Sequence, residues 1–307
     1  MANGKVVGIL ADIASNGSHT VYAVRIQELA AFVNKVQPYL HARLFPEDTR
    51  YMSPVAADAY PPYLDDPKTT DHKRQEESPE VKAVRASATK LEDSLRTFVA
   101  TQSFEWGNGM KEPQAHAEYE IQVLNGWQKF REPGTNKFHD SVEFPAINNT
   151  MVPGGEWSEL PKMVGNDYKM HVRLAGTVTV AGKTYKVFQW RAGIEDEVCQ
   201  WRSVLDLGFK SINKDRWVAC QGEVWTDVGY NIVRMSEHDD LGKSRWHDYQ
   251  AVVLYDWLKR EGEEPLTIPI SIATQVGDKD KVYWCRGLFT DYRQFQSAVK
   301  MRKASAR

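Results

Sequence analysis

Apolar and polar residues alternate along much of the second half of the chain. A period of two, with many β-branched and aromatic residues, is typical of strands that bury one face of a sheet. Gly, Pro, Asn and Asp separate these runs and predict turns between them. The stretch 249–259 also fits a helical period, so a helix stays an alternative there. The strands predicted in this way are 119–124, 169–180, 183–190, 216–225, 230–235, 251–258, 267–273 and 281–289.

The first third of the chain has a different pattern. Residues 5–13 form an apolar run that predicts a buried strand. Over 21–44 the apolar positions recur at mostly helical spacing, and Pro38 is expected to kink or end that helix. Residues 46–79 are rich in Pro, Asp, Lys and Tyr without a periodic apolar face, which predicts an extended excursion.

A second helix is predicted over 79–98. Ser78 is a favoured N-cap residue, and Pro79 is favoured at the first helical position. The apolar residues that follow recur in steps of three and four, which predicts one apolar face that packs on the sheet or on a partner helix. These residues are Val81, Val84, Ala88, Leu91, Leu95 and Phe98.

Together the patterns predict an α+β fold, with a helical N-terminal part followed by a mainly antiparallel β-sheet, sandwich or barrel. We expect the chain to divide into a strand-plus-helix part at 1–118, a β-rich domain at 119–295 and a basic tail at 296–307.

Composition narrows the class of protein. The 307 residues are 42% hydrophobic and 26% charged, as in soluble globular proteins. The N-terminal sequence lacks the features of a signal peptide, and no apolar run is long enough to span a bilayer. The cysteines, Cys199, Cys220 and Cys285, are few and widely spaced, which fits reduced thiols better than a disulfide framework. We therefore predict a cytoplasmic protein without membrane contact.

Charge is divided unevenly along the chain, although the net charge is only −2. Residues 1–159 contain 16 Lys+Arg and 22 Asp+Glu, whereas residues 160–307 contain 23 and 19. Such asymmetry indicates polyanion binding or an interaction tail, with a solvated terminus as the alternative. The basic residues near the C-terminus are Arg293, Lys300, Arg302, Lys303 and Arg307.

Local motifs for catalysis or metal binding are missing from the sequence. Residues 181–184 (AGKT) resemble the end of a phosphate loop, but Thr177 stands where that loop needs a glycine, so a hairpin turn is predicted. The segments 238–240 (HDD) and 247–248 (HD) lack metal-site spacing and predict a polar hairpin loop. We predict no metal and no cofactor, and an enzyme only if its site assembles from residues distant in sequence.

Tryptophans beside cations are the most distinctive feature of the sequence. The tripeptide Gln-Trp-Arg occurs at 189–191 and again at 200–202. If the copies pair as a hairpin about a loop at 194–197, Trp190 lies opposite Trp201, as a core pair or as an exposed stacking surface. Residues two apart on a strand share a face, so Trp284 and Arg286 are expected on one side of a sheet.

The leading hypothesis is a nucleic-acid-binding protein that prefers single strands, because Trp rings stack on bases while Lys and Arg contact phosphates. One alternative is a shell- or coat-like subunit that self-associates through its acidic and basic halves. The other is an enzyme with a pocket in the β-domain, which two buried carboxylates or a Cys-His pair in a concave pocket would favour. The predicted nucleic-acid-binding residues are Trp190, Arg191, Trp201, Arg202, Trp284, Arg286, Lys300, Arg302 and Lys303.

Overall fold

The computed structural model describes most of the chain beyond residue 76. The chain forms two compact units, residues 1–52 and 53–307. Backbone alone is described for 8–15, 18–25, 108, 140, 201–206, 211–215, 246–248, 278 and 281. The described residues are 8–15, 18–25, 77–108, 113, 115–140, 155–166, 169–180, 182–206, 211–241, 246–258, 265–278 and 281–293.

The described part of the first unit is a β-hairpin. Strand β1 (Gly8–Ser15) pairs antiparallel with β2 (Ser18–Arg25). The strand predicted at 5–13 is therefore confirmed over its described residues. The helix predicted over 21–44 is wrong at its start, because residues 21–25 belong to β2, and residues 26–44 lie outside the described chain. The excursion at 46–79 lies almost wholly outside it as well.

The second unit is built on one large antiparallel sheet, with the strand order β6-β5-β4-β3-β14-β13-β12-β11-β10-β8-β7 and β9 paired to β10. The sheet is open, which settles the predicted sheet, sandwich or barrel in favour of an open sheet. Residues 249–258 are strand rather than helix, and residue 259 lies outside the described chain. The strand bounds are β3 (Thr97–Asn108), β4 (Ala115–Leu124), β5 (Trp127–Arg131), β6 (His139–Asp140), β7 (His171–Val180), β8 (Lys183–Ala192), β9 (Cys199–Asp206), β10 (Ser211–Thr226), β11 (Ile232–Asp240), β12 (Trp246–Leu258), β13 (Leu266–Asp278) and β14 (Lys281–Arg293).

The predicted division at 118/119 falls inside β4 and stays a prediction.

The AGKT segment is a hairpin connection as predicted, since Val180 pairs with Lys183 across it and Gly182 has a positive φ of 76°. None of the described helices is long and apolar enough to cross a membrane.

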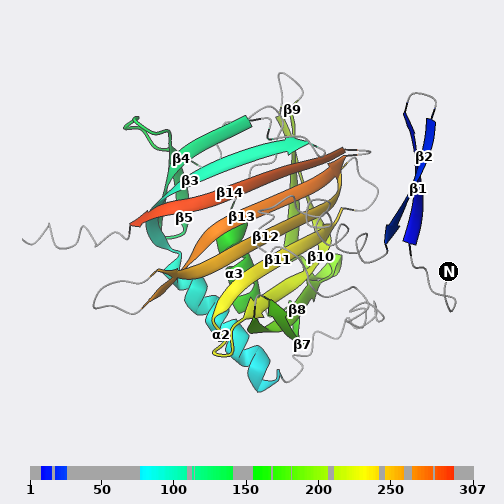
Figure 1. Cartoon of the computed structure of the whole chain (residues 1–307). Helices are drawn as coiled ribbons and strands as arrows, with labels where there is room; N and C mark the ends of the chain where they lie inside the picture. The colour runs from blue at the N-terminus through cyan, green and yellow to red at the C-terminus, as the bar shows by residue number, and fades with distance from the viewer. Residues whose placement is uncertain are drawn as a thin grey trace, which may run out of the picture. The chain divides into compact units, whose positions relative to one another are not determined.

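One face of the sheet, here called the inner face, packs against two helices, α2 (Pro79–Ser94) and α3 (Glu156–Asn166). The sheet curves around α3 (Figure 1). Phe104, Phe188 and Val253 on the inner face are buried in one core with the apolar residues of both helices. In α3, Trp157 lies between Phe98 and Phe289, at ring-centroid distances of 5.3 and 6.2 Å. Burial of the inner face therefore depends on both helices.

Helix α2 forms as its sequence predicts. The Ser78 side chain accepts a hydrogen bond from the Val81 backbone N–H, and Pro79 occupies the first turn. The predicted apolar stripe is buried from Val81 to Leu95. Phe98 is also buried but belongs to β3, so the predicted helix is four residues too long. The stripe packs on the sheet, which is the first of the two predicted alternatives.

Helix α3 was not predicted, because Pro161 and Gly165 interrupt its pattern. Pro161 has no N–H to donate to the Trp157 carbonyl one turn earlier. That carbonyl instead accepts a hydrogen bond of 2.8 Å from the Tyr255 hydroxyl of β12. At Gly165 a Cβ atom would come within 2.7–2.8 Å of Thr89 in α2, so the close helix contact requires glycine.

Arg85 of α2 connects the two helices. Its guanidinium donates to the Val164 carbonyl in the last turn of α3 (2.7 Å) and to the Met170 carbonyl (2.6 Å). It also forms an ion pair with Glu77 at 2.6 Å. A cation at a helix C-terminus is favourable, because the unpaired carbonyls there carry partial negative charge.

The two Gln-Trp-Arg copies do not pair with each other. Strand β8 and strand β9 both run antiparallel to β10, one after the other, so that Trp190 lies opposite Gly222 and Trp201 opposite Arg216. The predicted hairpin is therefore wrong. Ten-residue β8 and eight-residue β9 each find a partner in the sixteen residues of β10.

The prediction of three reduced thiols is also wrong. Cys199 at the start of β9 and Cys220 of β10 form a disulfide, with their Cα atoms 6.2 Å apart. Cys285 is a free, buried cysteine. Sequence spacing gave no sign of the pair, because the two cysteines meet only through the pairing of β9 and β8 with β10.

The packing of α2 predicts a large effect of shortening its buried side chains. Leu91→Ala should lower the free energy of unfolding by about 2–5 kcal/mol, because it leaves a cavity in the core. Lys82→Ala, on the exposed side of the same helix, should change it by less than about 0.5 kcal/mol. Urea denaturation of both variants measures the difference, and similar small effects would contradict the packing.

The disulfide predicts a simple labelling pattern. Unfolded in guanidinium with iodoacetamide and no reductant, the chain should gain one label, on Cys285. After treatment with a reductant it should gain three, one for each cysteine. Intact mass spectrometry distinguishes the two results. Three labels in protein purified without reductant would show that Cys199 and Cys220 are not joined.

Candidate functional site

A row of residues that crosses the inner face brings together an aromatic ring, a carboxyl and a hydroxyl. The strand registers place Trp190, Gly222, Glu237, Ala251 and Thr274 side by side on β8, β10, β11, β12 and β13. Large and small side chains alternate along this row. Adjacent strands lie about 4.8 Å apart, and Glu237 is two strands away from both Trp190 and Thr274. The backbone of Glu237 is therefore roughly 10 Å across the sheet from the backbone of each.

Gly222 has a structural reason to be glycine. A Cβ atom there would overlap the Ser236 carbonyl oxygen and would come 2.7 Å from Cε2 of Trp190. The indole of Trp190 therefore lies over Gly222, toward the strand that carries Glu237. Trp190 is only 1% exposed, whereas Glu237 is partly exposed.

Glu237 and Asp239, two residues apart on β11, point to the inner face and form a hydrogen-bonded carboxyl pair. Asp239 is buried and lies between Cys220 on β10 and Tyr249 on β12. The Tyr249 hydroxyl donates a 2.6 Å hydrogen bond to Glu156, the first residue of α3. Glu156, Glu237, Asp239 and Tyr249 are called the acid cluster below.

Burial governs the ionisation of the acid cluster. Burial, together with the negative charges of Asp239 and Glu156, raises the pKa of Glu237 well above its usual range. Burial also raises the pKa of Asp239 to about 7, and the charge of Glu156 adds to the rise, while the hydrogen bond from Glu237 opposes it. The pair therefore holds a shared proton over the acidic and neutral range, with Glu237 as the donor. Burial and the charge of Glu156 likewise raise the pKa of Tyr249 well above its usual range.

Several buried polar atoms facing the apolar inner core have no hydrogen-bond partner among the described residues. They are Trp190 Nε1, Asp239 Oδ1, Thr274 Oγ1, Trp157 Nε1 and both side-chain polar atoms of Gln102. Most buried polar atoms in proteins are paired, because an unpaired one costs about 1–3 kcal/mol. The inner face thus combines apolar walls with unused donors and acceptors, the composition of ligand sites.

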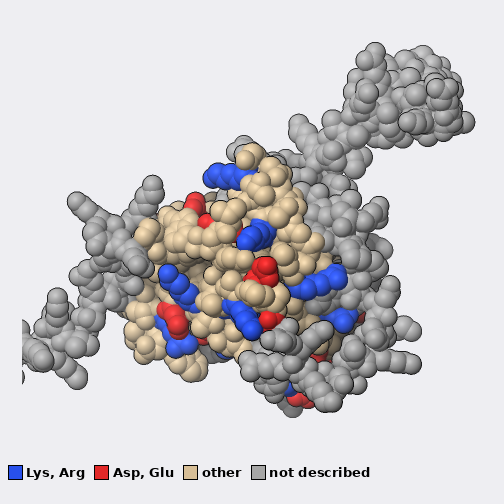
Figure 2. Space-filling view, turned by 90° about the horizontal axis from the view of Figure 1, so that it is seen from below, with Lys and Arg blue, Asp and Glu red and all other residues tan. Residues whose placement is uncertain are grey.

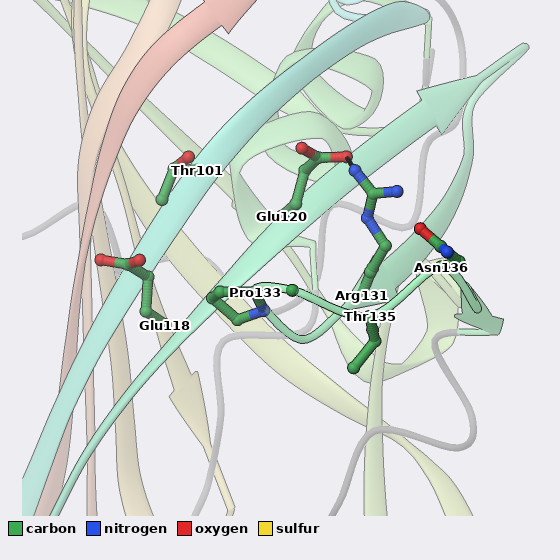
Figure 3. A pocket seen from close by; sticks show the side chains of 8 residues that line it. Thr101, Glu118, Glu120, Arg131, Pro133, Thr135 and Asn136 are labelled. Carbon is green, nitrogen blue, oxygen red and sulfur yellow. Dashed lines mark hydrogen bonds and ion pairs between the residues drawn. The ribbon is translucent and has the colours of Figure 1, made fainter.

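A second candidate lies on the opposite face of the sheet, near its β5 edge. A hollow of about 370 Å³ is lined by Thr101 of β3, Glu118 and Glu120 of β4, Arg131 of β5 and residues 133–136. Figure 3 shows Glu120 and Arg131 pointing toward each other, with the Glu118 carboxylate turned away from them. The walls are polar, so the hollow fits a small hydrophilic molecule.

The charges of the hollow are mostly satisfied within the protein. Glu120 forms ion pairs with Arg131 and with Arg293, the latter at 2.8 Å. Arg131 also lies over the Phe138 ring, 4.6 Å from its centroid. Glu118 is exposed and forms no ion pair among the described residues. Exposed charges of this kind are hydrated, so ligand binding in the hollow is expected to gain less electrostatic free energy than binding at the acid cluster.

The predicted stacking tryptophans are core residues. Trp190 is buried on the inner face and Trp284 is 5% exposed on the opposite face, where its ring lies against Gly107. Trp284 and Arg286 do share a face, as predicted, with the guanidinium 5.9 Å from the ring centroid. Arg286, however, is ion-paired with Glu105.

Of the other predicted binding residues, only Arg191 has a described side chain. Arg191 is half-buried on the face opposite to Trp190. Trp201 and Arg202 lie in β9, where only the backbone is described. The tail residues Lys300, Arg302 and Lys303 lie outside the described chain.

The prediction of a nucleic-acid-binding protein is therefore wrong. It relied on exposed indole rings at Trp190, Trp201 and Trp284, and the rings of Trp190 and Trp284 are buried. On the face drawn in Figure 2, Lys and Arg are interspersed with Asp and Glu and gather into no basic patch among the described residues. Single-stranded nucleic acid is withdrawn as a partner, while self-association stays a prediction.

The sequence reading missed the acid cluster, and it placed 238–240 in a polar loop. Residues 238–240 instead end strand β11, and Asp239 is buried. The signal that could have found the pair is the parity of β11, which places residues 235, 237 and 239 on one face. Residues 236, 238 and 240 are also polar, so sequence alone could not tell which set faces inward.

No protein-family model matches the chain, and no curated protein does. Solved structures of similar arrangement include a putative outer membrane lipoprotein-sorting protein domain from Vibrio parahaemolyticus, with 11% identity and a TM-score of 0.40 over 73% of this chain and 96% of that one. A DUF1329 family protein from Desulfovibrio piger has 10% identity and a TM-score of 0.39 over 71% and 94%. The lipoprotein LppX from Mycobacterium tuberculosis has 9% identity and a TM-score of 0.22 over 68% and 94%.

None of these proteins is described as binding nucleic acid, and two are described as lipoproteins or their sorting domains. At such TM-scores the likeness carries no conclusion about the ligand of this chain. The prediction of a cytoplasmic location is corrected on the structure itself: it relied on reduced thiols, and Cys199 and Cys220 form a disulfide of the kind that persists in oxidising compartments.

The raised pKa of Asp239 predicts how stability depends on pH. The carboxyl has a pKa near 4 when unfolded and about 7 when folded, so the folded state binds more protons between these values. The free energy of unfolding should therefore fall as pH rises from about 4 to 7, on the order of 1.4 kcal/mol for each pKa unit. Asp239→Asn should flatten this dependence, whereas Glu118→Gln should keep it. Equal slopes in urea titrations of all three proteins would contradict the assignment.

Proposed function

We propose that this chain is a binding protein that holds a lipid-like amphipathic molecule against the inner face of its sheet. One observation carries the proposal: polar atoms without a hydrogen-bond partner among the described residues face an otherwise apolar, buried wall. A molecule with an apolar body and a polar head complements such a wall, because it buries apolar surface and supplies the missing hydrogen bonds.

The partial exposure of three apolar residues supports one end of the sheet as the place where the ligand enters. Val172, Val198 and Tyr283 are apolar, only partly buried, and packed against the core of the inner face. Val172 lies in the same row as Trp190, and Glu237 of that row is also partly exposed. An apolar body can therefore reach the row from this end of the sheet, where β7 and β14 begin.

Binding is favoured over catalysis by the geometry of the ionisable groups. The two carboxyls of a glycosidase lie about 5–9.5 Å apart, with the scissile bond between them. The carboxyls of Glu237 and Asp239 are instead hydrogen-bonded to each other. The Cys285 thiol is buried, which raises its pKa far above the neutral range and makes it a poor nucleophile.

An oxidising compartment is the proposed place of action. The disulfide supports this, because paired cysteines persist in oxidising surroundings and are rare where glutathione keeps thiols reduced.

Calorimetric titration with 1-octanol tests the proposal, since this molecule joins an apolar chain to one hydroxyl. Thr274→Val should weaken octanol binding roughly 2- to 10-fold, because it removes one hydrogen-bonding group from the row. The same change should raise the melting temperature, because it removes an unsatisfied buried hydroxyl. Thr101→Val makes the identical change in the hollow on the opposite face and should leave octanol binding unchanged.

The proposal is overturned if the wild-type protein shows no saturable heat with octanol, octylamine or octanoate. It is equally overturned if Thr101→Val weakens binding as much as Thr274→Val does.

A further inference from the structure

The acid cluster is a partly buried group of acids that has no ion-pair partner among the described residues. No Lys, Arg or His of the described residues forms an ion pair with Glu156, Glu237 or Asp239. The charged groups that act on the Glu237–Asp239 pair are themselves acids, Glu156 and Glu159. Buried charges in proteins are normally paired, because desolvation of an isolated ion is costly.

Three other partly buried carboxylates of the sheet do have cationic partners. Glu223 on β10 is also largely buried, and Arg234 lies 3.0 Å away as its ion-pair partner. Glu105 is paired with Arg286, and Glu120 with two arginines. The acid cluster thus differs from these carboxylates in having no ion-pair partner within the part of the chain that the structure describes.

Trp190 supplies a second, independent feature of the same place. Its indole lies over Gly222, directly opposite the backbone of Glu237, and its Nε1 has no partner among the described residues. An ammonium group over a Trp ring is attracted by the negative face of the π-system, most strongly where water is excluded. The neighbours of Glu237 across the sheet, Gly222 and Ala251, are both small, and the Trp190 indole packs over Gly222.

We propose that the head group of the bound molecule is a protonated amine. Glu237 and Asp239 accept its N–H groups, Glu156 adds negative charge from the start of α3, and the Trp190 indole lies at its side. Thr274 Oγ1, two strands away in the same row on β13, can accept a hydrogen bond from a second polar group of the ligand. The inference rests on the proposed function, because it names the class of ligand that the inner face takes.

A matched set of ligands tests this inference. Octylamine, 1-octanol and octanoate share one chain length and differ in the charge of the head group. Calorimetry at neutral pH should show octylamine binding at least about 10-fold more tightly than octanol, which corresponds to 1.4 kcal/mol. Octanoate should be the weakest ligand, because it meets like charge.

Two isosteric variants locate the effect. Glu237→Gln and Asp239→Asn should reduce the preference for octylamine over octanol from at least about 10-fold to within about 3-fold. Glu118→Gln, which removes an exposed carboxylate on the opposite face, should keep the full preference for octylamine. Circular dichroism of each variant shows that loss of preference does not reflect unfolding.

The outcomes separate the two proposals. If octanol binds but octylamine binds no more tightly, the amine inference is wrong and the binding function stands. If Glu118→Gln removes the preference as Glu237→Gln does, general surface charge is responsible and the inference is again wrong. If none of the three ligands binds to the wild-type protein, both proposals fail together.

Discussion

The inner face of the large sheet must be covered, and this requirement determines most of the described fold. The two helices that cover it, of 16 and 11 residues, are short beside a sheet of this width. The sheet therefore curves around α3, and aromatic side chains such as Trp157 fill the space between the layers. Neither helix is self-sufficient: α3 takes a hydrogen bond from Tyr255 where Pro161 cannot donate one, and Arg85 connects its last turn to α2.

The same burial decides how the protein handles charge on its two faces. On the inner face, carboxyls lie beside aromatic rings and a disulfide, and their charge is reduced by sharing a proton rather than by ion pairing. On the other face, Glu120 and its arginines surround a hollow where water screens the charges. Of the two places, the inner face is the one where a bound molecule changes the electrostatic energy most.

Much of the fold follows from local pattern, whereas the candidate site does not. Helix α2 was predicted by its cap and stripe, and most strands of the second unit by their alternation. Helix α3 was missed because Pro161 interrupts its helical pattern. Strand β3 was missed because Phe98 follows Leu95 at helical spacing, so the predicted helix extended into the start of β3. Glu237 and Asp239 have polar neighbours in the sequence, so only the registers with β10 and β12 show that they face the core.

The order of strands also has a consequence for how the chain is made. Strand β14, at 281–293, lies between β3, at 97–108, and β13, so it alone joins the meander β3 to β6 to the rest of the sheet. Pairing of segments so far apart in sequence is slow, because a long loop must close before any contact forms. A nascent chain must therefore carry the edges of β3 and β13 unpaired until β14 has been synthesised. During that interval these edges are open to pairing with other chains, and β14 is the strand that closes both.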